Sequence, residues 1–143
     1  MNKKYFYGRH FIDNKDIISV SKSLKSNLSQ GPILNIFEKK IAKYFGSKYC
    51  LAFSSATAAL HVSIASLNLK KNSKAFTSAM TFVATTNACL YNGLKPVLID
   101  IDKNNFNLDI NLLEKKLSGQ KNKEKKLILP VHFGGLPCDL DRI

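Results

Sequence analysis

The 143-residue sequence is poor in cysteine, in arginine and in long apolar runs. Its three cysteines, Cys50, Cys89 and Cys138, are widely spaced and form no CxxC pair, so the sequence predicts neither a disulfide framework nor a zinc site. No segment reaches the roughly 18 apolar residues that span a bilayer, and the first residues have no apolar run typical of a signal peptide. We therefore expect a cytoplasmic protein without a membrane partner.

Lysine supplies almost all of the formal net charge of +12, because Arg9 and Arg142 are the only arginines among 22 basic residues. A basic balance of this size is typical of proteins that bind nucleic acid or anionic membranes. Arginine, however, is the residue preferred for bidentate contacts with phosphates and bases, and the lysines are scattered along the chain. The charge therefore indicates a lysine-rich surface, and we expect no nucleic-acid partner.

Hydrophobic residues make up 45% of the chain, which suffices for one core and argues against two domains. Short apolar runs alternate along the chain with segments of helical periodicity, and this alternation predicts an α/β fold with a mainly parallel sheet and flanking helices. The predicted strands are residues 49–53, 74–78, 96–102 and 127–131. The predicted helices are residues 13–27, 33–44, 58–67, 82–93 and 109–117, of which 58–67 and 82–93 are expected to be buried.

Ligands of open parallel sheets bind beyond the carboxyl ends of the strands, so the segments that follow the predicted strands form the candidate site. The first, SSAT at 54–57, places small residues at the start of a helix, where free backbone N–H groups bind anions such as phosphate. The alternative is that a serine only caps the helix, which is more common. The sequence contains neither GxGxxG nor GxxxxGK[ST], so dinucleotide and P-loop sites lose their main support.

Four further side chains at these strand ends each have two interpretations. Phe82 is suited to stack on a planar ligand, although a core position is commoner for phenylalanine. His132 is either a substrate contact or a structural histidine. Asp100 and Asp102 resemble a carboxylate pair, but capping of a turn is the more common role. On the residues alone, the chain is an α/β domain with a candidate phosphate site, and no reaction is indicated.

Longer motifs around these segments carry a family resemblance. They are, in order, LSQGPILNIFEKKIAKYFGSKYCLAFSSATAALHVSIASL, TFVATTN, PVLIDID and LILPVHFGGLPCDLDRI. With them the chain resembles the N-terminal half of the DegT/DnrJ/EryC1/StrS sugar aminotransferases, fold type I enzymes that depend on pyridoxal phosphate. The likeness is nearest to members that aminate a UDP-linked 4-keto-6-deoxy-N-acetyl sugar for pseudaminic acid, and aminoarabinose-type members share several of the motifs.

The resemblance implies an architecture and a set of binding residues. The chain would be the N-terminal part of the large domain, with helices and a substrate-contact turn in 1–46 and the start of the sheet in 47–143. Residues implied to bind the cofactor are Ala56, Thr57 and Ala58 at its phosphate and Phe82 on its pyridine ring. Residues implied to lie near the nucleotide sugar are Tyr7, Asn27, Leu28, Ser29 (in place of the usual threonine) and His132.

The resemblance also implies residues that this sequence does not contain. Family enzymes use a lysine that binds the cofactor covalently and an aspartate that keeps the pyridine nitrogen protonated, and both follow the segment that ends here at Ile143. No lysine of the chain stands in such a context, so we assign no catalytic residue and no metal, and expect the chain alone to lack transaminase activity. The family further implies glutamate as amino donor and a homodimer of the full-length protein. The alternative is a phosphate-binding remnant without chemistry.

Overall fold

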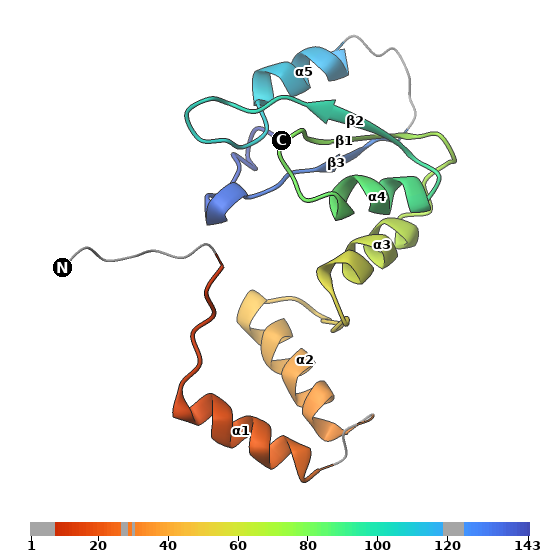
Figure 1. Ribbon diagram of the computed structural model, residues 1–143. Coiled ribbons are helices and arrows are strands. Elements are labelled where there is room, and N and C mark those ends of the chain that lie inside the picture. Colours follow the sequence, from red (N-terminus) through yellow and green to blue (C-terminus); the bar gives the residue numbers. More distant parts are fainter. Residues whose placement is uncertain (1–7, 27–28, 30, 119–124) are drawn as a thin grey trace, which may run out of the picture. The chain divides into compact units, whose positions relative to one another are not determined.

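A computed structural model describes residues 8–26, 29, 31–118 and 125–143, which contain five α-helices, three strands and one 3₁₀ turn (Figure 1). Contacts divide the chain into two compact units, residues 1–52 and 53–143, and each is described by itself. None of the helices in the described part of the chain combines the length and apolar character needed to cross a membrane.

The first unit contains helices α1 (Asn14–Leu24) and α2 (Pro32–Phe45). The Asp13 carboxylate accepts the backbone N–H of Asp16 at 3.0 Å and the Asp16 carboxylate accepts that of Asp13 at 3.0 Å, which is a reciprocal capping box. Helix α2 ends at Gly46, whose φ of 65° is left-handed. These signals place both helices close to their predicted bounds, although no residue of either helix is buried.

Residues 49–53 do not form the strand that the apolar run YCLAF predicts. The backbone N–H of Ala52 instead donates to the Glu38 carboxylate on α2 at 2.9 Å. Among the described residues, no strand pairs with this segment. Because a strand is stabilised by its ladder and by packing on neighbouring strands, a short apolar run with aromatic residues is not sufficient to form one.

The second unit is built on a three-stranded parallel sheet with the order β2-β1-β3. Its strands are β1 (Lys74–Ser78), β2 (Lys95–Ile99) and β3 (Leu127–Leu129). The central strand β1 has the predicted bounds, and Phe76 lies opposite Val97 on one side and Ile128 on the other. Strands β2 and β3 end earlier than predicted, because Ile101 bridges to Leu108 instead of continuing along β1 and because Pro130 has no N–H for the ladder.

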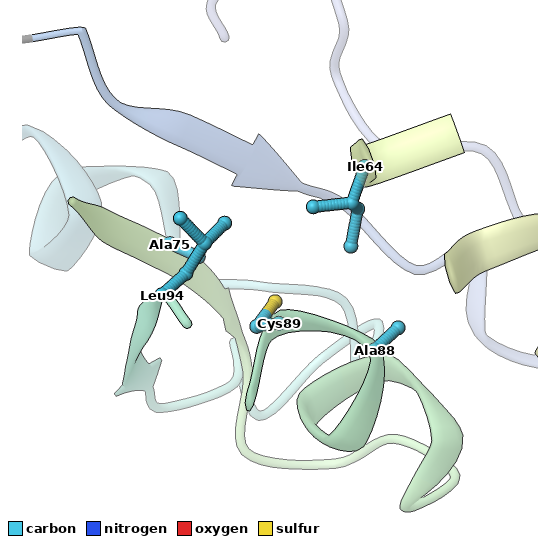
Figure 2. Packing of buried hydrophobic residues seen from close by; sticks show 5 residues of the cluster. All are labelled: Ile64, Ala75, Ala88, Cys89 and Leu94. Carbon is cyan, nitrogen blue, oxygen red and sulfur yellow. The ribbon is translucent and has the colours of Figure 1, made fainter. Parts of the chain in front are cut away.

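Helices cover both faces of this sheet, which gives three layers (Figure 1). On one face Ala75 packs with side chains from α3 (Ala56–Ser66) and α4 (Ala84–Tyr91) and from the turn before β2. Figure 2 shows this cluster, which comprises Ile64, Ala75, Ala88, Cys89 and Leu94. On the other face Phe76 packs with Ile99, Leu108 and Leu113, the last from α5 (Ile110–Ser118). Alternation along the strands therefore assigns neighbouring residues to opposite cores.

The expectation that residues 58–67 form a buried helix is half wrong. The helix forms as α3, but only Ile64 of its residues is buried, and Val62 is 47% exposed. The apolar residues of α3 lie on all sides of the helix, but only one side contacts α4 and the sheet within the second unit. Helix α4 matches the expectation better, because four of its eight residues are buried.

The two-faced core predicts a graded response to truncation of side chains. Phe76 has no exposed surface and is the largest fully buried side chain among the described residues, so Phe76→Ala is expected to cost about 3–5 kcal/mol of unfolding free energy. Leu98→Ala is the matched control, because Leu98 is 55% exposed on the neighbouring strand and its loss should cost about 1 kcal/mol or less. Urea denaturation of the full-length gene product measures both. Equal losses would contradict the placement of the core.

Candidate functional site

The carboxyl ends of the three strands share one edge of the sheet, because all pairings are parallel. The segments that leave this edge are residues 79–83, 100–109 and 130–138. Figure 1 shows that α4 begins at this edge, directly after the loop that leaves β1, whereas α3 begins farther from the sheet, beneath α4. The edge therefore combines the N-terminus of α4 with three loops.

The start of α3 has both a serine cap and open backbone donors. Ser55 is extended, and its hydroxyl accepts the N–H of Ala58 at 3.2 Å, which confirms the capping interpretation. The backbone N–H groups of Ala56 and Thr57 have no acceptor among the described residues, and both residues are exposed. Two main-chain donors and the Thr57 hydroxyl are thus available to an anion at the positive end of the helix.

Phe82 lies on the surface of the second unit rather than in its core. Its side chain is 75% exposed, so the interpretation of Phe82 as a core residue is wrong. The segment that carries it is fixed by the N–H of Met80, which donates to the Ser78 hydroxyl at 3.1 Å, and by a 2.8 Å hydroxyl pair between Thr81 and Thr85. The ring is therefore presented on a well-anchored turn between β1 and α4.

His132 has a structural hydrogen bond in the loop after β3. Its Nδ1 accepts the backbone N–H of Cys138 at 3.0 Å, which in the neutral ring places the proton on Nε2. The Cys138 thiol donates to the carbonyl of Val131 at 3.2 Å. Burial raises the pKa of this thiol, although its backbone hydrogen bonds act in the opposite direction. The structural interpretation of His132 is confirmed, and its exposed imidazole leaves the predicted substrate contact open.

Asp100 and Asp102 organise the turn after β2. Their carboxylates accept the backbone N–H groups of Ile101 at 2.8 Å and of Asn104 at 2.7 Å, respectively. The Asp100 carbonyl also accepts the N–H of Asp109 at 2.9 Å. The turn-capping interpretation is therefore confirmed. The described residues contain no group of three or more His, Cys, Asp or Glu side chains arranged to hold a metal ion.

The residues predicted to contact a nucleotide sugar are only partly described. Tyr7, Asn27 and Leu28 lie outside the described residues. Ser29 lies in an exposed bend of the first unit. No lysine among the described residues is buried, whereas a lysine that binds a cofactor covalently is commonly activated by a buried or cationic site.

Asn107 is a residue of this edge that the sequence interpretation missed. Its side chain is only 4% exposed, and it bonds to backbone groups of the loop after β3. The sequence treats it as part of a polar turn, KNNFN, because three other asparagines lie within residues 104–111. The one local signal is its place before Leu108, which is buried and bridges back to Ile101.

Comparison with known proteins identifies a family that matches this chain. Residues 10–143 match the model of the DegT/DnrJ/EryC1/StrS aminotransferase family. A relative from Shewanella sediminis, UDP-4-amino-4-deoxy-L-arabinose--oxoglutarate aminotransferase, is 35% identical over 136 residues, which are 94% of this chain and 34% of the relative. The chain thus spans about a third of the length of the curated relatives that it matches.

Solved structures agree with this result. Helicobacter pylori PseC, an aminotransferase involved in the biosynthesis of pseudoaminic acid, superposes with a TM-score of 0.85 at 30% identity, covering 98% of this chain and 37% of PseC. The E. coli GDP-4-keto-6-deoxy-D-mannose-3-dehydratase with bound hydrated PLP superposes with a TM-score of 0.84 at 28% identity, covering 97% of this chain and 36% of the dehydratase. These likenesses confirm the predicted α/β fold, in which a parallel sheet is flanked by helices.

The serine cap of α3 yields a stability prediction. Ser55→Ala removes the acceptor of the Ala58 N–H and is expected to cost about 1 kcal/mol of unfolding free energy. Ser54→Ala is the matched control, because Ser54 is exposed and neighbours the cap, and it should change stability by less than about 0.5 kcal/mol. Thermal melts of the full-length gene product compare the two variants. If both variants have the melting temperature of the wild type, the Ser55 cap does not contribute to stability.

Proposed function

Because the chain belongs to the DegT/DnrJ/EryC1/StrS aminotransferase family, we propose that it carries the cofactor phosphate site and part of the substrate site of a pyridoxal phosphate-dependent sugar aminotransferase. The observation that carries the proposal is the start of α3, where the N–H groups of Ala56 and Thr57 have no acceptor among the described residues. The family resemblance supports the proposal that the cofactor phosphate binds at this turn.

The residues at this edge fit such a cofactor. Its phosphate would accept hydrogen bonds from the N–H groups of Ala56 and Thr57 and from the Thr57 hydroxyl, at the favourable end of the helix dipole. The Ala58 N–H is taken by Ser55, so Ala58 would contribute small size, which lets the phosphate approach the backbone. The exposed ring of Phe82 would stack on the pyridine. When bound, pyridoxal phosphate supplies an electron sink for moving an amino group.

The finer proposal concerns the substrate. We take it to be a UDP-linked 4-keto-6-deoxy-N-acetyl sugar, aminated to UDP-4-amino-4,6-dideoxy-N-acetyl-β-L-altrosamine with glutamate as donor. The likeness to PseC supports this choice, and the 35% identity to the aminoarabinose enzyme supports the alternative, another sugar aminotransferase. Proposed substrate contacts are Tyr7, Asn27, Leu28, Ser29 and His132, whose Nε2–H is a donor suited to a sugar oxygen.

The proposed enzyme also needs catalytic residues and an assembly that the side chains named above do not provide. We assign the cofactor-binding lysine and the pyridine aspartate to the portion of the relatives that this chain does not cover. A homodimer is the proposed assembly of the full-length protein. A cytoplasmic location is proposed because all three cysteines are free thiols.

The proposed activity is tested with the full-length gene product, pyridoxal phosphate, glutamate and the UDP-linked 4-keto-6-deoxy-N-acetyl sugar. The expected result is an amino sugar detected by mass spectrometry together with an equal amount of 2-oxoglutarate. The UDP-4-keto pentose of the aminoarabinose route is the competing substrate, and its preferential amination would favour the alternative aminotransferase. Cofactor binding without turnover of either sugar would favour the phosphate-binding remnant.

The proposed stacking of Phe82 is tested by cofactor titration of the apo full-length gene product. Phe82→Ala should weaken pyridoxal phosphate binding about fivefold to tenfold, because ring stacking contributes about 1 kcal/mol. Val83→Ala is the matched control: Val83 is the next residue and is 57% exposed, so its truncation should leave the affinity unchanged. An unchanged affinity in Phe82→Ala would remove Phe82 from the proposed cofactor site.

A further inference from the structure

Two loops at the carboxyl edge of the sheet are joined by one buried side chain. Asn107 lies in the loop after β2, and its amide Nδ2 donates to the carbonyls of Leu136 at 3.1 Å and of Pro137 at 3.3 Å. Its Oδ1 accepts the backbone N–H of Phe133 at 2.9 Å. All three partners belong to the loop after β3. Both donors and the acceptor of the amide are therefore used between loops rather than within one.

The backbone of Asn107 is itself fixed before the side chain reaches across. Its carbonyl accepts the N–H of Asp102 at 2.9 Å, and its N–H donates to the Asn105 side chain at 2.9 Å. The preceding residue, Phe106, has a left-handed φ of 61°, which turns the chain at this point. Because the backbone of Asn107 is already fixed, its side chain loses little further entropy when it bonds to the other loop. Removing the side chain would leave the backbone groups that it contacts without these hydrogen bonds.

The three contacts bracket the hydrogen bond that orients His132. Phe133 directly follows His132, and Pro137 directly precedes Cys138, whose N–H donates to His132 Nδ1. Asn107 thus holds the two ends of residues 133–137 at the spacing that this hydrogen bond needs. Glycines at the tip of the loop, Gly134 and Gly135, have φ values of 62° and 86°, so the tip itself relies on flexible residues.

We propose that Asn107 is a positioning residue for His132: it closes residues 132–138 into a fixed loop and thereby sets the orientation and tautomer with which the imidazole faces substrate. The part that concerns substrate rests on the proposed function, whereas the closure of the loop does not. Cys138 reports on the closure directly, because it lies within the loop and is 7% exposed.

The closure is tested by peptide-resolved alkylation of the full-length gene product. Asn107→Ala should raise the alkylation rate of Cys138 about tenfold, because the loop then opens more often. Cys89, which is fully buried between α4 and the sheet, is the internal reference and should keep its rate. Asn104→Ala is the matched control, because Asn104 is exposed in the same loop.

A second variant covers the case in which Asn107→Ala unfolds and exposes both cysteines. Asn107→Asp keeps an acceptor for Phe133 but loses the donors to Leu136 and Pro137, and it should raise the rate at Cys138 alone. If neither variant raises the Cys138 rate relative to the wild type by more than it raises the Cys89 rate, the proposed closure is overturned.

The link to His132 is tested by a double-mutant cycle on steady-state kinetics with the keto sugar. Asn107→Asp should raise KM severalfold with a smaller change in kcat, and this effect should disappear when His132 is already alanine. Fully additive effects would show that Asn107 does not act through His132. Faster alkylation of Cys138 in a protein that turns over no sugar would support the closure while contradicting the proposed function.

Discussion

The parallel pairing of β1 with strands on both of its sides is the constraint on which the second unit depends. Both edges of β1 are hydrogen-bonded, and its register assigns Ala75 to the α3 and α4 face and Phe76 to the α5 face. A shift by one residue would exchange these assignments and place a phenyl ring where a methyl group now packs. The same pairing brings the carboxyl ends of the three strands to one edge, so it determines both the packing of the core and the position of the loops that follow the strands.

Polar groups at this edge are largely satisfied within the protein. The Thr77 hydroxyl donates to the carbonyl of Leu129 at 2.9 Å, and the Ser78 hydroxyl accepts from the segment that carries Phe82. In the described part of the chain, no buried side-chain nitrogen or oxygen lacks a partner. The backbone N–H groups of Ala56 and Thr57 differ from these groups, because they are exposed and have no acceptor among the described residues, so water or a ligand can accept their hydrogen bonds.

Local signals in the sequence were sufficient for much of the fold. Strand β1 has its predicted bounds, and the caps at Asp13 and Gly46 and the Ser55 cap depend on residues within a few positions. The failures share a different physical origin. Whether residues 49–53 form a strand, and how much of α3 is covered, depends on elements distant in the sequence, and the apolar run itself is the same with or without them.

The same distinction divides the candidate site. Ser55 reaches three residues along the chain, so its role follows from the helix that it begins, whereas Asn107 reaches residues 26 to 30 positions away. The side chain of an asparagine in a polar turn usually bonds within that turn, as that of Asn105 does by accepting the N–H of Asn107, whereas the side chain of Asn107 is buried and bonds to another loop. The capped start of α3 could therefore be predicted from the sequence because its hydrogen bond is local, whereas the loop that carries His132 is held by tertiary hydrogen bonds, which can be identified only when both loops are placed in space.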